Sequence, residues 1–178
     1  MLSLAILGLL MDESLHGYEI RLRLQRLLGL SGLISFGSLY PKLAKLNLQG
    51  FVSVEIVTPE VSPNTKTKLS ERKKRQVYTI TQLGREAFSE KLSASYLKNA
   101  SDDRAFVAHL AFIEYASPED SKNLISHRKR VLQDRLEIAP TTKNRFLKKW
   151  QELEANFINS QINFLDTLNI KPEENRTV

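Results

Sequence analysis

The stretch that decides the fold covers residues 37–51 and reads GSLYPKLAKLNLQGF. Leucines recur in it at the spacing of one face of an α-helix, and a glycine follows where a helix is expected to end. At about 100° per residue, a second face collects small, polar and cationic side chains. That face holds Ser38, Lys42, Lys45 and Gln49, and the leucine stripe holds Leu39, Leu43 and Leu46. The pattern predicts a helix over about 37–49, stopped by Gly50, with one side for the core and one for a partner.

Two further signals lie at the start of this helix. Ser35 or Ser38 is expected to cap it, because a serine hydroxyl accepts a hydrogen bond from an otherwise unpaired amide of the first turn. Pro41 is expected in the first turn, where a residue without an N–H is tolerated.

Helices are expected before this stretch and two strands after it. The apolar run Leu2–Met11 predicts a buried first helix, and a second helix is expected to begin near His16-Gly17. Phe51–Val57 and Gln76–Ile80 are rich in β-branched residues and predict two strands, after which Thr81 is expected to cap another helix. Three helices followed by a two-stranded wing is the order of a winged helix-turn-helix. Its third helix enters the major groove of DNA.

The positive charge is concentrated in the expected wing. The chain carries 26 Lys and Arg against 20 Asp and Glu, and residues 1–92 hold 13 of these cations against 8 acids. Six cations lie close together, opposed by Glu71 alone: Lys66, Lys68, Arg72, Lys73, Lys74 and Arg75. A surface loop of this charge repels itself unless an anion is nearby. Lysines on an isolated helix usually only solvate it, but this second cationic element favours a nucleic acid as the partner.

Residues 93–178 are expected to be helical. Ser117-Pro118 marks the start of one helix, since it supplies a cap and a proline at the first helical position. The last helix carries an apolar stripe typical of a helix packed on another helix: Phe146, Trp150, Leu153, Phe157, Phe164 and Leu168. The stripe fits a dimer interface or the core of a single chain. A second interpretation places Trp150 or Phe146 in the wall of an effector pocket.

The expected fold class is therefore mainly α with a small β-wing. A winged helix-turn-helix DNA-binding domain is expected over residues 1–92. A helical dimerisation domain is expected over residues 93–178, with effector binding as a further role to test.

Four short segments of the N-terminal half form an ordered set. They are His16-Gly17-Tyr18-Glu19-Ile20, Gly37-Ser38-Leu39-Tyr40-Pro41-Lys42-Leu43, Leu46 to Gly50-Phe51, and Tyr78-Thr79-Ile80-Thr81-Gln82-Leu83-Gly84-Arg85. Together they resemble the PadR family of transcriptional regulators and span about residues 2–92. The resemblance implies a winged-helix DNA-binding domain and a homodimer built by the C-terminal helices. It also implies repression that a small aromatic or hydrophobic effector relieves. The chain departs from the family pattern at Asn47-Leu48-Gln49, where acidic residues are usual.

The resemblance also implies residue roles. Tyr40 matches the recognition-helix tyrosine expected to touch DNA, and helical periodicity puts its ring at the edge between the leucine stripe and the cationic face. Tyr18 matches a second-helix tyrosine, for which packing is expected. The full set expected to contact DNA is Ser38, Tyr40, Lys42, Lys45, Lys68, Arg72, Lys73, Lys74 and Arg75. Effector-binding residues stay open.

Other classes of protein lack their signals in this sequence. There are no cysteines, and His16, His109 and His127 have no metal-ligand spacing. No glycine-rich phosphate loop is present, so neither catalysis nor a metal or organic cofactor is expected. The apolar run at Leu2–Met11 is too short for a membrane helix and lacks the features of a signal peptide, so a cytoplasmic protein is expected.

The expected partner is double-stranded DNA. A homodimer with two-fold symmetry predicts a pseudo-palindromic operator. The alternative is a winged-helix regulator that a protein partner controls, or one that activates instead of repressing.

Overall fold

The computed structural model describes residues 1–28, 36–57, 75–94, 96–137 and 142–168. The chain clusters into two compact units. The first consists of Met1–Leu92 with Val107–Phe112, and the second of Ser93–Phe106 with Ile113–Val178.

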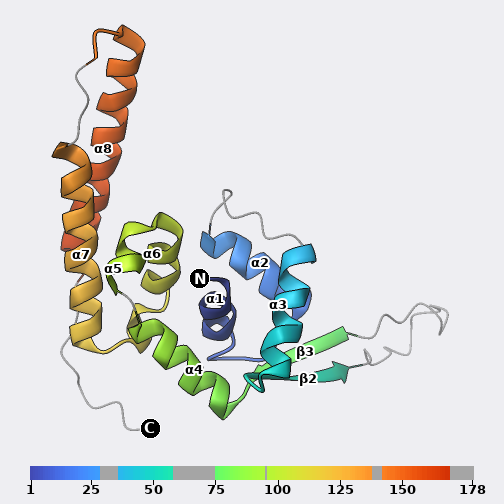
Figure 1. Cartoon of the computed structure of the whole chain (residues 1–178). Helices are drawn as coiled ribbons and strands as arrows, with labels where there is room; N and C mark the ends of the chain where they lie inside the picture. The colour runs from blue at the N-terminus through green and yellow to red at the C-terminus, as the bar shows by residue number, and fades with distance from the viewer. Residues whose placement is uncertain (29–35, 58–74, 95, 138–141, 169–178) are drawn as a thin grey trace. The chain divides into compact units, whose positions relative to one another are not determined.

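The first unit contains the helices that the sequence predicts. They are α1 (Leu2–Leu9), α2 (Gly17–Leu28), α3 (Phe36–Leu48) and α4 (Gln82–Ser93). α1 contacts α2, α2 contacts α3, and α3 contacts the strand that follows it (Figure 1). The apolar positions of α2 point into the core: Ile20, Leu24 and Leu28 are buried.

A three-stranded antiparallel sheet completes this unit. β1 (Leu15–His16), β2 (Val52–Val57) and β3 (Arg75–Ile80) are arranged in the order β1-β3-β2. β2 pairs with β3 along its whole length, and β1 pairs with Tyr78 and Val77 of β3. The two predicted wing strands are confirmed. β1 was not predicted, because two residues are too short to show an alternating pattern.

The leucine stripe of α3 lies in the core of the first unit. Leu39, Leu43 and Leu46 are each at most 1% exposed. Burying a leucine side chain stabilises a fold by roughly 1.5–3 kcal/mol, so these three contacts strongly favour one rotation of α3 about its axis. The predicted orientation of the helix is confirmed.

Pro41 lies deeper in α3 than the sequence predicts. The helix begins at Phe36, so Pro41 falls in the second turn and not in the first. A proline there cannot donate to the carbonyl four residues earlier, which is that of Gly37. Gly37 is exposed, so water can reach this carbonyl and the helix tolerates the proline. Of the two expected caps, Ser35 lies outside the described residues and Ser38 lies inside the helix.

α3 ends in a Schellman motif. Gly50 has a φ of 73°, in the left-handed region that a glycine adopts at no steric cost. Its amide donates to the carbonyl of Asn47 at 2.9 Å, and the amide of Phe51 donates to the carbonyl of Leu46 at 3.0 Å. The helix stop predicted at Gly50 is confirmed.

The chain turns from β3 into α4 at a crowded corner. Thr81 caps α4 as predicted, because its hydroxyl accepts a hydrogen bond from the amide of Gly84 at 3.0 Å. The same hydroxyl donates to the carbonyl of Gly50 at 2.6 Å. The backbone amide of Thr81 donates to the carbonyl of Phe51 at 3.0 Å. A Cβ built on Gly84 would lie 2.0 Å from the Phe51 carbonyl oxygen. The corner joins α4 to the residues that end α3, and it requires a glycine at position 84.

The segment Val107–Phe112 packs within the first unit. The rings of Phe112 and Phe88 meet edge to face, with centroids 5.8 Å apart. A Cβ built on Gly8 of α1 would lie 2.6 Å from the Phe112 ring. A larger residue than glycine at position 8 would therefore displace this aromatic pair.

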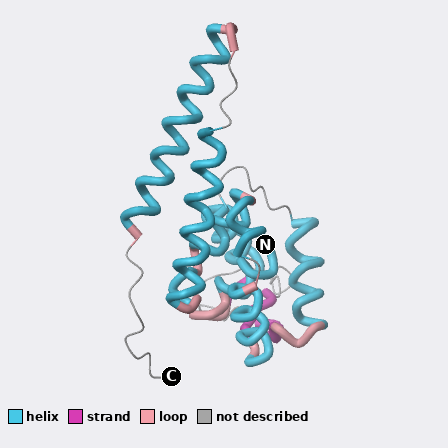
Figure 2. The backbone as a smooth tube through the Cα atoms, turned by 60° about the vertical axis from the view of Figure 1, so that its left-hand side comes forward, coloured by secondary structure: helices cyan, strands magenta, loops and turns pink. Residues whose placement is uncertain are grey.

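The second unit is helical. It contains α5 (Tyr96–Ser101), the start of α6 (Asp103–Leu110) and the short 3-10 turn η3 (Ile113–Tyr115). α7 (Pro118–Glu137) and α8 (Arg145–Thr167) run antiparallel to each other as a long pair (Figure 2).

Both long helices begin with a capping side chain. The hydroxyl of Ser117 accepts a hydrogen bond from the amide of Asp120 at 3.0 Å. The side-chain oxygen of Asn144 accepts from the amides of Phe146 and Leu147, at 2.9 and 3.2 Å. The helix start predicted at Ser117-Pro118 is confirmed.

We expect Gly84→Ala to destabilise the first unit. The added methyl group cannot lie 2.0 Å from a backbone oxygen, so the corner has to open. The expected cost is at the upper end of the roughly 1–3 kcal/mol typical of overpacking. Chemical denaturation followed by circular dichroism measures it. Glu90→Ala, at an exposed position of the same helix, is the control and should change stability by less than about 0.5 kcal/mol. Equal midpoints for the wild-type chain and Gly84→Ala would contradict this account of the corner.

Candidate nucleic-acid interface

The outer face of α3 carries the polar and cationic side chains that periodicity places there. Ser38 and Lys45 are exposed and Lys42 is half-buried. They lie on the side of the helix that the leucine stripe leaves open. A hydroxyl and two ammonium groups on one helix face are hydrogen-bond donors for phosphate oxygens and guanine edges. Gln49, predicted on the same face, follows the last residue of α3.

Tyr40 is 39% exposed. It lies two residues from both Ser38 and Lys42, which is about 200° around the helix, so it borders the leucine stripe on the side away from them. Its ring packs on Gly17, the first residue of α2. A Cβ built on Gly17 would lie 3.1 Å from Cε1 and 3.2 Å from the hydroxyl oxygen of Tyr40. The start of α2 therefore supports one side of the phenol, and another part of the phenol is open to solvent.

Tyr78 lies on the central strand β3, opposite Leu15 of β1. It is 4% exposed, and its hydroxyl donates to Oε1 of Gln76 at 2.8 Å. Burial raises the pKa of Tyr78 above its ordinary value of 10.0, and the electrostatic influence of Tyr40 raises it further. Sequence reasoning assigned no role at the site to Gly17, because contacts between distant parts of the chain leave no local pattern.

The wing contributes one predicted cation to the described surface. Arg75 is exposed at the first residue of β3, where it pairs with Val57. The remaining wing cations of the predicted site lie outside the described residues: Lys68, Arg72, Lys73 and Lys74. Their contact with DNA stays a prediction.

The packing expected for Tyr18 is wrong. Tyr18 is 57% exposed on the first turn of α2, and the guanidinium carbon of Arg21 lies 5.9 Å from its ring centroid. Helical periodicity gives the reason. Ile20 and Leu24 occupy the buried side of α2, and a residue two positions before Ile20 lies about 200° away from it.

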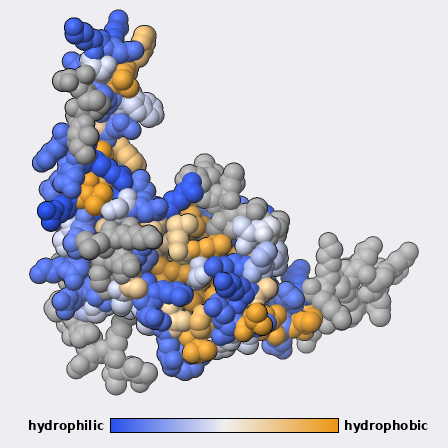
Figure 3. Space-filling view, in the orientation of Figure 1, coloured by the Kyte–Doolittle hydropathy of each residue, from blue (hydrophilic) through white to orange (hydrophobic). Residues whose placement is uncertain are grey.

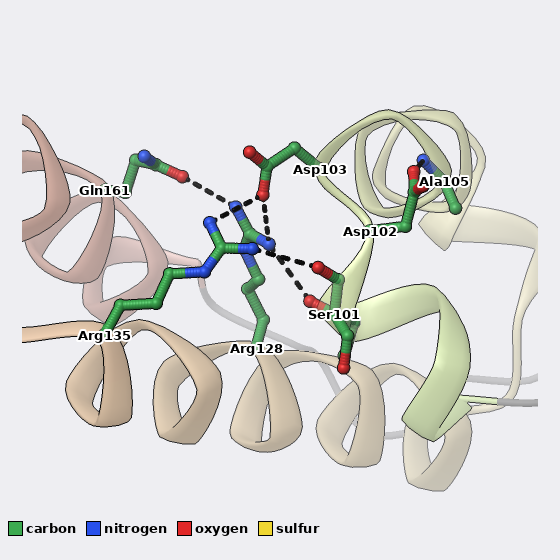
Figure 4. A network of polar contacts seen from close by, with 8 residues as sticks. Ser101, Asp102, Asp103, Ala105, Arg128, Arg135 and Gln161 are labelled. Atoms are coloured by element: carbon green, nitrogen blue, oxygen red, sulfur yellow. Dashed lines mark hydrogen bonds and ion pairs between the residues drawn. The ribbon is translucent and has the colours of Figure 1, made fainter. Parts of the chain in front are cut away.

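A polar cluster in the second unit surrounds Arg128, which is 2% exposed (Figure 4). Nη1 of Arg128 lies 2.8 Å from Oδ1 of Asp103 and donates to the carbonyl of Ala100 at 3.0 Å. Nη2 donates to Oε1 of Gln161 on α8 at 3.0 Å. The guanidinium carbon also lies 4.8 Å from the centroid of the Phe106 ring. One buried side chain therefore connects α5, α6, α7 and α8. No motif in the sequence marks Arg128 for this role.

Asp103 joins a second arginine to this cluster. Nη1 of Arg135 donates to the same Oδ1 at 2.9 Å, and Nη2 donates to the carbonyl of Ser101 at 3.0 Å. Burial by itself would raise the pKa of Asp103. The hydrogen bonds and charges of Arg128 and Arg135 outweigh burial and hold this pKa below its ordinary value.

α8 carries both buried and exposed apolar residues. Toward α7, Gln161 bonds to Arg128 and Leu165 is buried. Five further apolar side chains, which we call the aromatic face of α8, are 50–81% exposed: Phe146, Trp150, Leu153, Phe157 and Phe164. Their spacing puts them beside Gln161 around the helix, with Trp150 within about 20° of it. Figure 3 shows apolar surface along the α7–α8 pair. Most of the stripe predicted in this helix is therefore not part of a core within the single chain.

Within the described ranges, no group of three histidine, cysteine or acidic side chains is placed to hold a metal ion. In the same part of the chain, no helix combines the length and the apolar character needed to cross a membrane.

The first unit has the architecture of a winged helix-turn-helix, with α3 beside a two-stranded wing and a short third strand at the wing's base. Residues 6–90 match the family model described as the transcriptional regulator PadR-like family. Residues 6–90 therefore form a domain of the PadR-like transcriptional regulator type. The resemblance seen in the sequence is confirmed over these residues.

Solved structures similar to the chain include Bacillus subtilis PadR in complex with operator DNA and Bacillus subtilis PadR in complex with p-coumaric acid. Each is 20% identical, with a TM-score of 0.43, and the match covers 93% of this chain and 96% and 95% of those chains. A PadR-like transcriptional regulator from Bacillus cereus is 21% identical over 92% of this chain and 93% of that chain, with a TM-score of 0.39. A search of the curated proteins finds no match. The family assignment rests on the match over residues 6–90.

We expect acid to weaken the second unit through Asp103. The folded-state pKa of Asp103 lies below its ordinary value of 3.8. Its carboxylate therefore contributes stability above about pH 4, and this contribution is lost as the pH falls through the folded-state pKa. Denaturation midpoints at pH 5 and pH 3 should fall more for the wild-type chain than for Asp103→Asn. Asp134→Asn removes an exposed acid from α7 and should keep the wild-type decline. Parallel declines for the wild-type chain and Asp103→Asn would refute the role of this carboxylate.

Proposed function

We propose that the chain is a homodimeric transcriptional repressor that binds a pseudo-palindromic operator and is released by a small aromatic or hydrophobic effector. One observation carries the DNA-binding part: α3 presents a hydroxyl and two ammonium groups on one open side, and a partly exposed phenol beside its leucine stripe, within a PadR-like winged helix. These groups belong to Ser38, Tyr40, Lys42 and Lys45. In this fold the third helix is the element that enters the major groove.

The residues divide into two roles on the duplex. Ser38 and Tyr40, near the start of α3, and Lys42 and Lys45, further along it, contact base edges and the nearest phosphates. Arg75 and the wing cations Lys68, Arg72, Lys73 and Lys74 neutralise the DNA backbone, which contributes affinity without sequence preference.

A second copy of the chain is the partner that we propose for the aromatic face of α8. Large aromatic side chains exposed along one helix face favour association, because covering them removes apolar surface from water. Pairing two such faces around a two-fold axis places two winged helices on one assembly. Each half-site contact then raises the effective concentration of the other, which supports a palindromic operator.

The effector part follows the family resemblance, and no residue is assigned to it. A small molecule that binds the folded state raises the melting temperature by mass action, so a thermal-shift screen of aromatic acids and planar hydrophobic compounds can identify the effector.

A reporter gene placed behind the operator separates repression from activation. Expression of the wild-type chain should lower the reporter signal if the chain represses and raise it if the chain activates.

We expect Lys42→Ala and the wing variant Lys73→Ala/Lys74→Ala/Arg75→Ala to affect DNA binding differently. Lys42→Ala should weaken binding to the operator about tenfold more than binding to random DNA, since a good base contact supplies roughly 1–3 kcal/mol of discrimination. The wing variant should weaken both alike and flatten the dependence of affinity on salt, because fewer counterions are released. Fluorescence anisotropy over a salt series measures both effects.

The duplex used as operator is the one that the wild-type chain selects from a random library. Lys122→Ala, at an exposed lysine of α7, is the control and should bind both duplexes as the wild-type chain does. Equal losses on the two duplexes for Lys42→Ala would refute its role in base reading.

We expect Trp150→Glu and Phe157→Glu to separate the dimer into monomers. Each places a charge in an interface that we propose to be apolar, at a cost of about 2 kcal/mol or more. Sedimentation velocity over a concentration series measures the dissociation constant. Lys148→Glu is the matched control. It lies nine residues from Phe157, which is about two and a half turns, and so points to the opposite side of α8. A wild-type monomer, or a Phe157→Glu dimer of wild-type affinity, would rule out this interface.

A further inference from the structure

The two-residue strand β1 holds the start of α2 against the central strand of the sheet. Leu15 pairs with Tyr78, and His16 pairs with Val77. Gly17 follows directly as the first residue of α2. The strand pairing therefore keeps Gly17 close to Tyr78, although the two residues are far apart in the sequence.

Gly17 packs against the ring of Tyr40. A Cβ on Gly17 would lie 3.1 Å from Cε1 and 3.4 Å from Cζ of Tyr40, so even a methyl group would require the ring to shift by a few tenths of an ångström. Tyr40 therefore has the backbone at the start of α2 against one side of its ring.

Such support matters for an aromatic side chain on a recognition surface. Tyrosine turns about only two side-chain torsions, so contact along one side of the ring is enough to set the direction of the hydroxyl. Gly17 is itself buried and does not reach a duplex. We expect any effect that it has on DNA binding to act through Tyr40.

We propose that Gly17 is a positioning residue for Tyr40: it holds the phenol in the direction in which it contacts the duplex, and it thereby sets the discrimination between operator and other DNA. This inference rests on the proposed function, because it requires Tyr40 at the protein–DNA interface. In this account, the pairing of β1 with β3 keeps Gly17 in a fixed position.

The test measures the affinity of the full chain for the selected operator and for random DNA. Gly17→Ala should lower the ratio of the two affinities about three- to tenfold, which is part of what one good base contact supplies. Affinity for random DNA should stay within about twofold. In a Tyr40→Ala background the same change should have no further effect, because no ring is left to position. Tyr115→Phe, which removes a hydroxyl from the second unit, is the control and should match the wild-type chain.

Additive losses in the Tyr40→Ala background would overturn the inference, and so would equal losses on both duplexes. The melting temperature of each variant is measured alongside. Tyr40→Phe, which keeps the packed ring and removes only the hydroxyl, keeps the test decisive if Gly17→Ala fails to fold: it should lower the ratio of affinities as Gly17→Ala does, and an unchanged ratio would overturn the inference. Unchanged discrimination in Tyr40→Ala, together with reduced discrimination in Lys42→Ala, would overturn the inference and leave the proposed function standing. A wild-type chain that prefers no duplex over random DNA would overturn the proposed function itself.

Discussion

Burial of Leu39, Leu43 and Leu46 is the constraint on which the outer face of α3 depends. At roughly 1.5–3 kcal/mol for each side chain, the stripe contributes an energy comparable to the net stability of a small domain. Turning α3 by one residue, about 100°, would expose the stripe and forfeit this energy. The orientation of Ser38 and Lys45 follows from the core, and these two residues need no contact of their own to face outward.

The wing is connected to α3 by equally short-range contacts. Gly50 ends the helix in the left-handed region, and β2 begins two residues later. Thr81 bonds back to the Gly50 carbonyl, and Gly84 fits against the carbonyl of Phe51 with no room for a Cβ. The cationic side of the helix and the base of the wing therefore belong to one closely packed piece. A winged helix needs this rigidity if its helix and its wing are to contact one duplex together.

Local signals in the sequence predicted the elements whose causes are local. The leucine spacing of α3, the glycine at position 50 and the cap at Thr81 each act within one or two turns, and the structure confirms all three. The strand β1 and the contact between Gly17 and Tyr40 have no such signal, because each depends on a segment elsewhere in the chain. Pro41 was misplaced because sequence signals fix a helix start only approximately: α3 begins at Phe36, one residue before the predicted start, and Pro41 falls in its second turn.

In the candidate site, too, local patterns predicted the positions of side chains but not their contacts with distant segments. Periodicity placed Tyr40 at the border of the leucine stripe, and its ring is partly exposed, but periodicity gave no sign of what supports the ring. The expectation for Tyr18 came from a family match, and the buried positions of its own helix already argue against it. In α8, the apolar stripe predicted a packing surface. Its spacing is the same whether the partner is a helix of the same chain or of another one.

The two units share one principle, which is that an inward contact sets the direction of an outward surface. In α3 the inward contact is apolar. In α8 it includes Gln161, which accepts from one terminal nitrogen of the buried Arg128. Rotating α8 on α7 would break this hydrogen bond and expose Leu165. Phe157 and Trp150 lie within about 40° of Gln161 around the helix and are nevertheless exposed, so no described part of the chain covers this continuation of the side that meets α7.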